Sequence, residues 1–262
     1  MRASLIQIAV DPDEPVESRR ARVARLVREE HGRAELVVLP ELWPTGAFAY
    51  EEFAAGSEPL KGPTYEAMAA AARDAEVWLH AGSVVEAASG GASGAVLYNT
   101  SLVFSPDGEL AASYRKIHRF GFDKGEAVMM AAGEDLVTVD LPQLTVGVAT
   151  CYDLRFPELF RGLVDAGAQA FVVPAGWPAR RLAHWTLLAK ARAVENQAYV
   201  LACGTAGTHA GVEQAGHSIV VDPWGEVLAE AGPDEEILRV VLDPAKVTTT
   251  REQFPALKDR VL

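Results

Sequence analysis

Short apolar runs rich in β-branched residues alternate along the chain with patterns that favour helices. The apolar runs predict strands at residues 5–10, 36–39, 77–83, 98–104, 109–114, 136–140, 144–150, 170–173, 199–203, 218–221, 227–229 and 237–242. Periodic or alanine-rich stretches predict helices at residues 16–30, 65–75, 156–166 and 184–196. Strands that alternate with helices in this way predict an α/β fold.

The stretches between these elements contain turn signals but no linker that would divide the chain. Ser-Pro-Asp-Gly at 105–108 and Asp-Pro-Trp-Gly at 222–225 predict hairpins, and the small residues of Ala87–Gly94 predict a loop. No repeat or low-complexity segment interrupts the sequence. A chain of 262 residues can bury most of the surface of its unfolded form. We therefore expect one domain over residues 1–262.

Charge, hydropathy and cysteine content argue against several kinds of partner. The formal net charge is −12, so no nucleic-acid surface and no anionic membrane surface is expected. No apolar stretch approaches the length of a membrane span, and the run Ala3–Val10 is too short for a secretory signal. The two cysteines, Cys151 and Cys203, suggest no disulfide framework. These features predict a cytoplasmic protein.

The segment Gly147–Glu158 places a thiol between a predicted strand and a predicted helix. The apolar run stops at Cys151, and Asp153 and Pro157 then give a helix-start pattern. Unpaired backbone N–H groups at such a junction favour a thiolate and stabilise a developing oxyanion. Cys151 is therefore a candidate nucleophile, although a free cysteine at a strand end is also typical of a small buried core residue.

Two other predicted strands lead into ionisable residues. Leu36–Leu39 is followed by Pro40 and Glu41, and Lys116 lies in the segment Tyr-Arg-Lys-Ile-His after a predicted hairpin. In α/β sheets, ligands and chemistry collect at the carboxyl ends of the strands. Taken singly, Glu41 and Lys116 fit ordinary surface charges. Together with a cysteine at a third strand end, they predict a catalytic site.

The motifs LPE, YRKIH and CYDLRFPE resemble those of the nitrilase superfamily of carbon–nitrogen hydrolases, and the resemblance extends from Ile6 to Pro244. That superfamily is marked by a Glu–Lys–Cys triad, which falls here on Glu41, Lys116 and Cys151. The resemblance implies a four-layer α-β-β-α sandwich with mixed sheets, and a homodimer or higher homo-oligomer. It implies no cofactor, and the six histidines show no metal-ligand spacing.

The resemblance also implies a role for each member of the triad. Cys151 would attack an amide carbon and form a thioester, while Glu41 would carry the proton between thiol, leaving ammonia and water. Lys116 and the backbone N–H of Tyr152 would stabilise the oxyanion. The partner is then a small-molecule amide.

Several residues near these motifs have accessory interpretations. Relatives carry a second glutamate after the lysine motif, and Glu126 fits this auxiliary role by order and context, with Glu134 as the competitor. Arg155 and Glu158 lie three residues apart, which predicts an intrahelical ion pair. Cys203 lies within an apolar strand pattern and is expected to be a core thiol.

The segment Gly176–Trp185 follows a predicted strand and is expected to border the substrate pocket. Trp177 is a candidate wall for an acyl chain, and Arg180 or Arg181 is a candidate partner for a substrate carboxylate. His184 is a further candidate contact. A core tryptophan and solvated arginines would fit the same residues.

The segments CYDLRFPE, GWPARRLAHW and KARAVENQAYV look most like the ω-amidase branch, whose members hydrolyse terminal amides of short dicarboxylic or 2-oxo acids. The resemblance therefore predicts a cysteine-dependent amidase for such a compound. Alternative substrates are deaminated glutathione and an N-carbamoyl amine. A true nitrilase and a non-catalytic interaction protein are further alternatives. No G-x-G-x-x-G follows the first strand, which argues against a dinucleotide-dependent oxidoreductase.

Overall fold

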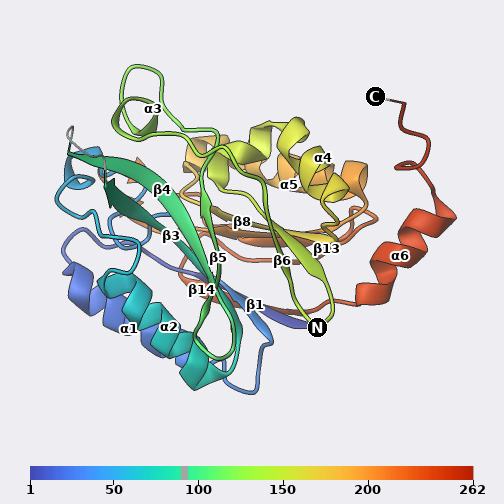
Figure 1. Ribbon diagram of the computed structural model, residues 1–262, viewed down its shortest axis with the longest axis horizontal. Helices are drawn as coiled ribbons and strands as arrows, with labels where there is room; N and C mark the ends of the chain where they lie inside the picture. Colours follow the sequence, from blue (N-terminus) through green and yellow to red (C-terminus); the bar gives the residue numbers. More distant parts are fainter. Residues whose placement is uncertain (90–93, 262) are drawn as a thin grey trace.

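The computed structural model describes residues 1–89 and 94–261, and two six-stranded sheets form its centre (Figure 1). The first sheet has the strand order β14-β1-β2-β3-β4-β5. Its strands are β1 (Arg2–Gln7), β2 (Leu36–Val38), β3 (Trp78–Ser89), β4 (Ala95–Phe104), β5 (Leu110–Arg115) and β14 (Glu236–Val241). Strands β1, β2 and β3 run parallel, whereas β4, β5 and β14 pair antiparallel with their neighbours.

The second sheet has the order β13-β12-β9-β8-β7-β6 and is also mixed. Its strands are β6 (Val137–Asp140), β7 (Thr145–Val148), β8 (Ala170–Ala175), β9 (Tyr199–Gly204), β12 (Ile219–Val221) and β13 (Val227–Glu230). Strands β7, β8 and β9 run parallel, and the outer strands are antiparallel. A separate two-stranded ribbon consists of β10 (Thr208–His209) and β11 (Val212–Glu213).

Helices cover the outer face of each sheet. On the first sheet lie α1 (Val16–Arg28) and α2 (Pro63–Ala75), and on the second lie α4 (Pro157–Asp165) and α5 (Leu182–Asn196) (Figure 1). The other helical segments are η1 (Tyr50–Glu52), α3 (Glu126–Met129), η3 (Cys151–Arg155), η4 (Ala179–Arg181) and α6 (Pro244–Gln253). Within the described residues, no helix has the length and hydropathy needed to cross a membrane.

Three layers of buried side chains separate the four layers of secondary structure. The middle one lies between the two sheets and includes Val38 and Leu201. A second packs α1 and α2 onto the first sheet around Met68, and a third packs α4 and α5 onto the second sheet around Trp185. This arrangement confirms the predicted α/β class and the four-layer sandwich that the resemblance implies.

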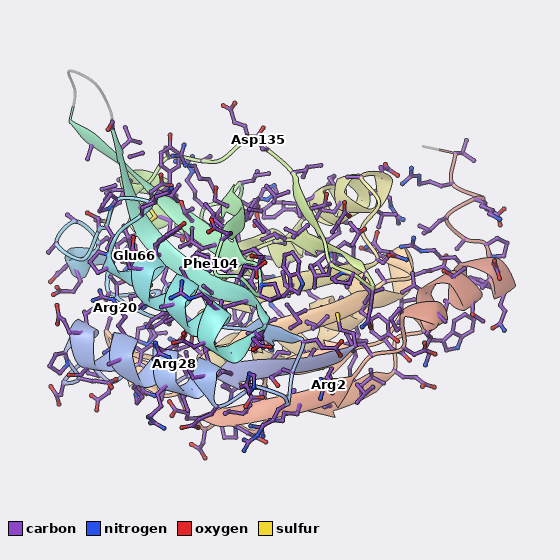
Figure 2. The ribbon with its side chains drawn as sticks, turned by 60° about the horizontal axis from the view of Figure 1, so that its bottom comes forward. Arg2, Arg20, Arg28, Glu66, Phe104 and Asp135 are labelled. Carbon is purple, nitrogen blue, oxygen red and sulfur yellow. The ribbon has the colours of Figure 1, made fainter. Side chains whose placement is uncertain are left out.

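The first outer layer shows why α1 and α2 pack side by side. Figure 2 looks onto this face, with Arg20 and Arg28 on α1 and Glu66 on α2. The apolar stripe of α1 is buried at Val23 and Val27, while Arg28 on its exposed side pairs with Asp74 of α2 at 2.8 Å. An amphipathic helix of this kind is held mainly by the burial of its apolar face, and an exposed ion pair adds little to its stability.

Two sequence predictions about strands were wrong. Ala87–Gly94 is not wholly a loop, because Ala87–Ser89 continue β3 and pair with β4. Backbone pairing in a long hairpin outweighs the weak strand propensity of small residues here. Residues 90–93 of the predicted loop lie outside the described residues. The first strand spans Arg2–Gln7 rather than 5–10, because its register is set by antiparallel pairing with β14.

The sequence analysis also missed α6. Only Val247 and Thr250 of this helix are buried, so it lacks the apolar stripe from which helices are predicted. Its local start signals are nevertheless present. The Asp243 side chain accepts a hydrogen bond from the backbone N–H of Ala245 at 3.0 Å, and Pro244 occupies the first turn.

A histidine is buried between the two sheets. His80 on β3 is in register with Val38 and Val103, which both belong to the middle layer of buried side chains. Burial lowers the pKa of His80 from its usual 6.5 to about 4. The charged imidazole is disfavoured at this buried position, so the folded protein holds His80 in its neutral form.

The low pKa of His80 predicts a pH-dependent stability. Its contribution is fully present above pH 6.5 and is lost as the pH falls through the interval between 6.5 and about 4. By linkage the loss amounts to about 3 kcal/mol. We expect urea unfolding at pH 7, 6, 5 and 4.5 to show a shallower decline of the free energy of unfolding in His80→Gln than in the wild type. Parallel declines would contradict this assignment. Burial gives His209 a pKa of about 4 as well, so the double variant His80→Gln/His209→Gln should decline least.

Candidate active site

The candidate nucleophile lies in a tight turn at the end of β7. Cys151 is buried and begins η3 with a φ of 48°, a left-handed conformation that is costly for a residue with a side chain. A capping box stabilises the turn, because the Thr150 side chain and the Asp153 carboxylate each accept a hydrogen bond from the other's backbone N–H. Asp153 is therefore the third residue of the turn and not its N-cap.

The candidate general base lies just beyond β2, in the other sheet. Glu41 is buried, and its carboxylate accepts three hydrogen bonds. Oε1 accepts from Lys116 Nζ at 2.7 Å and from Asn99 Nδ2 at 2.8 Å, and Oε2 accepts from the backbone N–H of Gly176 at 2.8 Å. Because Gly176 follows β8, this last bond joins the two sheets at the site.

Position 176 requires a glycine because the side chain of Ala47 lies too close to leave room for a Cβ. A Cβ there would lie 2.2 Å from the Cβ of Ala47 and 3.6 Å from Oε2 of Glu41. The carbonyl oxygen of Gly176 faces the Cys151 thiol at 3.7 Å, so one peptide segment contacts both the thiol and the carboxylate. Glu41 and Cys151 thus meet across Gly176 although they come from different sheets.

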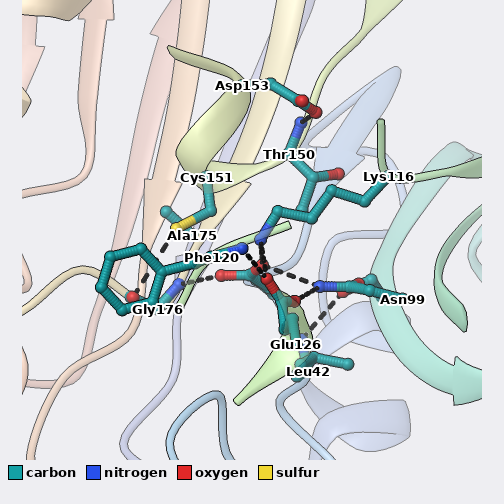
Figure 3. A network of polar contacts seen from close by, with 12 residues as sticks. Leu42, Asn99, Lys116, Phe120, Glu126, Thr150, Cys151, Asp153, Ala175 and Gly176 are labelled. Atoms are coloured by element: carbon teal, nitrogen blue, oxygen red, sulfur yellow. Dashed lines mark hydrogen bonds and ion pairs between the residues drawn. The ribbon is translucent and has the colours of Figure 1, made fainter. Parts of the chain in front are cut away.

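Lys116 follows β5 and connects two carboxylates. Its ammonium donates to Glu41 Oε1 and to Glu126 Oε2, both at 2.7 Å, and the whole side chain is buried (Figure 3). Glu126 begins α3 and also accepts a hydrogen bond from the backbone N–H of Phe120 at 2.7 Å. Glu134, the other candidate for the auxiliary glutamate, is exposed.

The sequence analysis missed Asn99. Its Nδ2 donates to both Glu41 Oε1 and Glu126 Oε1, and so it links the two carboxylates. Asn99 belongs to a polar run in the middle of β4, and it is followed by Thr100 and Ser101, which are also buried. Three consecutive polar residues inside an apolar strand were the available signal, because buried polar groups need partners.

The charge cluster changes the protonation of its members. Burial alone would lower the pKa of Lys116, but the charges of Glu126 and Glu41 outweigh it and hold that pKa well above its usual value. Burial raises the pKa of Glu126, and Lys116 opposes this rise in part. The lysine therefore remains a cation throughout the neutral range.

The candidate nucleophile is held as a thiol. Burial, and then the negative charge of Glu41, raise the pKa of Cys151 well above its usual value, and Lys116 compensates only in part. The expectation that the backbone N–H groups of the junction give a thiolate was wrong, because a neighbouring carboxylate and desolvation dominate here. A proton must leave Cys151 before it can attack, and Glu41 is the adjacent acceptor.

A narrow cavity gives access to these groups. Its volume is about 20 Å³, close to the space that one water molecule occupies. Lys116, Cys151 and Glu126 form its floor, and Phe48, Phe120, Tyr152 and Trp177 are among its walls. An adjoining depression of about 530 Å³ shares Phe48 and Phe120 with it and opens outward. A small group can reach the thiol, and the rest of a ligand would lie in the depression.

Two arginines stand at the mouth of the cavity. Arg155 lies over the ring of Trp177 at 5.0 Å, and Arg181 lies over the ring of Phe120 at 5.2 Å. Within the described residues, neither guanidinium forms an ion pair with a carboxylate. Burial, and then the charges of Arg180 and Arg155, lower the pKa of Arg181. The mouth thus holds positive charge without a counterion from the described chain.

The pocket residues predicted from the sequence are only partly brought together. Trp177 and Arg181 line the cavity. Arg180 is exposed and reaches only the outer depression, and His184 is exposed and contacts Arg155. The prediction of an Arg155–Glu158 ion pair was wrong, because the Arg155 side chain turns toward Trp177.

The second cysteine does not line the cavity. Cys203 is buried on β9 beside the carbonyl oxygens of Ile6 and Val38, as expected for a core thiol. In residues 1–89 and 94–261, no group of three or more His, Cys, Asp or Glu side chains is arranged to hold a metal ion.

Comparison with known proteins identifies the family of this chain. A family model for carbon–nitrogen hydrolases matches residues 2–252. The chain is 42% identical over 260 residues to the 2-oxoglutaramate amidase of Paenarthrobacter nicotinovorans, covering 97% of this chain and 87% of that protein. It is 37% identical over 270 residues to omega-amidase NIT2 of Mus musculus, covering 99% of this chain and 94% of that protein.

Solved structures show the same fold. Nit3 of Saccharomyces cerevisiae, a member of branch 10 of the nitrilase superfamily, matches with a TM-score of 0.88 and 32% identity over 100% of this chain and 97% of that one. A CN-hydrolase superfamily protein of Xanthomonas campestris, which carries an arsenic adduct in its active site, matches with a TM-score of 0.90 and 29% identity over the same shares. The family model and these relatives span almost the whole sequence, and the chain belongs to the carbon–nitrogen hydrolase family.

Proposed function

We propose that this protein is an ω-amidase, which hydrolyses the terminal amide of a short dicarboxylic or 2-oxo acid to a carboxylate and ammonia. The observation that carries the proposal is the pair of arginines, Arg155 and Arg181, at the mouth of the cavity that ends at Cys151. Relatives named 2-oxoglutaramate amidase and omega-amidase support the same substrate class. A substrate carboxylate would supply the missing counterion, since guanidinium and carboxylate form strong paired hydrogen bonds.

In the first half of the proposed reaction, the thiol becomes an acyl carrier. Glu41 takes the Cys151 proton as Sγ attacks the amide carbon, and the carbonyl π electrons move to oxygen. Lys116 and the backbone N–H of Tyr152 stabilise that oxyanion. The carbon–nitrogen bond then breaks, Glu41 gives its proton to the nitrogen, and ammonia leaves a thioester on Cys151.

In the second half, water replaces ammonia. Glu41 takes a proton from water as the hydroxyl oxygen attacks the thioester carbon, and Lys116 again faces the oxyanion. The carbon–sulfur bond breaks, and Glu41 returns the proton to Sγ. The raised pKa of Cys151 suits this cycle, because each turnover ends with a neutral thiol. Glu126 and Asn99 hold Lys116 and Glu41 in place and contribute no proton to the balance.

The setting we propose is a homodimer in the reducing cytoplasm. Both thiols are free and buried, which suits a reducing compartment. Leu187 and Val194 are exposed on α5, and Gly225 packs so closely against Val194 that an added Cβ would lie 2.4 Å from it. Trp224 and Phe254, both exposed, contact each other beside this loop. Exposed apolar side chains near this loop favour a contact between subunits.

The two cysteines form a matched pair for testing the nucleophile. Cys151→Ala should lower kcat by about 10⁴-fold or more without unfolding the protein, because no other group can form the thioester. Cys203→Ala removes a buried thiol outside the pocket and should keep most of the activity. The measurement is ammonia release from an ω-amide, with mass detection of an acyl adduct on Cys151. Substantial turnover by Cys151→Ala would refute the mechanism.

The charged pair is tested by replacements of equal size. Lys116→Met and Glu41→Gln should each lower kcat by about 10²–10⁴-fold, the usual contribution of an oxyanion donor or a general base. Glu134→Gln is the control, since Glu134 is an exposed carboxylate outside the cavity and should retain wild-type kcat. Single-turnover acylation, followed by mass spectrometry, distinguishes a chemical defect from slow product release. Normal acylation in Glu41→Gln would assign proton transfer to another group.

The substrate class is tested with the arginines. An ω-amide with a free distal carboxylate should have a higher kcat/KM than its methyl ester, and Arg155→Ala and Arg181→Ala should each reduce that preference by about 10-fold or more. Arg180→Ala should leave it unchanged, because Arg180 lies outside the inner cavity. Equal rates for the acid and the ester in the wild type would exclude an anionic substrate and leave a neutral amide as the candidate.

A further inference from the structure

One buried carboxylate beneath the nucleophile takes no part in the proposed reaction. Asp153 is completely buried and does not line the cavity. It lies two residues after Cys151 in the same turn. Buried carboxylates are costly unless several donors surround them, so its contacts need an explanation.

Four donors converge on this carboxylate. Oδ2 accepts from the backbone N–H of Thr150 at 2.8 Å and from the hydroxyl of Tyr114 at 2.7 Å. Oδ1 accepts from the backbone N–H of His118 at 3.0 Å and is 2.7 Å from His118 Nδ1, which carries the donating hydrogen when it faces a carboxylate. Each carboxylate oxygen therefore accepts two hydrogen bonds from protein groups.

The donors come from two segments that carry the catalytic side chains. Tyr114 and His118 lie two residues on either side of Lys116, and Thr150 and Asp153 lie on either side of Cys151. The first segment ends β5 in one sheet, and the second follows β7 in the other. The Asp153 carboxylate thus joins the backbone that carries the lysine to the backbone that carries the thiol.

His118 is fixed on its other face as well. Its ring stacks on Phe156 at 3.7 Å between centroids and 6° between planes, and Phe156 directly follows η3. The Tyr114 hydroxyl also accepts a hydrogen bond from the backbone N–H of Ile117 at 3.3 Å. Segment 114–118 is therefore pinned to the nucleophile turn at both of its ends.

We propose that Asp153, Tyr114 and His118 are positioning residues that fix the Cys151 sulfur relative to the Lys116 ammonium. The inference rests on the proposed roles of Cys151 and Lys116. A nucleophile and an oxyanion donor carried by separate sheets need such a link, because a misplacement of about 1 Å can cost roughly 10²-fold in rate. The left-handed φ of Cys151 adds to this need, since a strained turn persists only where its surroundings hold it.

Two tyrosines allow a matched test. Tyr114→Phe deletes the hydroxyl on Asp153. Tyr199→Phe deletes the hydroxyl of another buried tyrosine, which bonds the backbone of Asp243 and does not line the cavity. Both changes should lower the free energy of unfolding. Only Tyr114→Phe should also lower kcat, by about 10-fold, with KM nearly unchanged, because positioning acts on the chemical step. Equal stability losses with full kcat in both variants would overturn the proposal.

His118 allows a rescue experiment. His118→Leu and His118→Asn both lose the stack on Phe156, but an asparagine amide can place a donor where Nδ1 stands. We expect His118→Leu to lower kcat by about 10-fold and His118→Asn to recover most of that loss. If the two variants have the same kcat, the contact with Asp153 does not position the site.

A readout without substrate separates this inference from the proposed function. If the proposed roles hold, the rate at which iodoacetamide alkylates Cys151 should depend on how Glu41 and Lys116 face the sulfur. Tyr114→Phe and His118→Leu should slow this alkylation by about the same factor as kcat, and Tyr199→Phe should not. If Cys151→Ala retains turnover, the proposed function fails. If Cys151→Ala is inactive while Tyr114→Phe alkylates and turns over normally, the positioning inference fails alone.

Discussion

The structure of the site depends on one buried ammonium shared by two carboxylates. Lys116 lies 2.7 Å from both Glu41 and Glu126, and none of the three side chains reaches bulk solvent. Removing charges from water is costly, and an ion pair offsets that cost only when further hydrogen bonds satisfy the remaining lone pairs. Asn99 and the backbone N–H groups of Phe120 and Gly176 supply them, so the surrounding chain must hold several donors in place.

The excess of carboxylate in this cluster has a chemical effect. Burial is the main reason that the pKa of Cys151 rises, and the charge of Glu41 adds to the rise because Lys116 offsets it only in part. The thiol therefore waits in its neutral form, which is less prone to oxidation and to reaction with unrelated electrophiles than a thiolate. In the proposed reaction, Cys151 becomes nucleophilic only when an electrophile lies close enough for the thiol proton to pass to Glu41 as the new bond forms.

Much of this candidate site was predictable because its ionisable residues lie just beyond the ends of strands. Glu41, Lys116 and Cys151 each follow a predicted strand, and the packing of the two sheets brings these three strand ends together. Asn99 was not predictable in this way, since its function depends on which strand pairs with which. Arg155 was misread because a spacing of three residues suggests an ion pair within a helix, whereas the side chain stacks on Trp177 instead.

The elements of the fold were predictable where the sequence has a clear apolar pattern. Elements with a strong apolar period were found from the sequence, and α6 was missed because it buries only two residues. The choice between Arg180 and Arg181 also lay beyond the sequence, because adjacent residues of a short 3₁₀ turn point in different directions. Side-chain direction in such a turn depends on the packing of its neighbours, which no local pattern specifies.

The site is formed by residues from both sheets, and this has a consequence for how the protein becomes active during synthesis. Glu41, Lys116 and Glu126 belong to the first half of the chain, and Cys151 and Gly176 belong to the second. If the proposed roles of these residues are correct, neither half holds a complete site, and a growing chain becomes active only after the two sheets have packed together. A change that separated the two sheets would move Cys151 and Gly176 away from Glu41 and Lys116, while each sheet could keep its own strand pairing. Activity is therefore a more sensitive report of an intact molecule than its content of secondary structure.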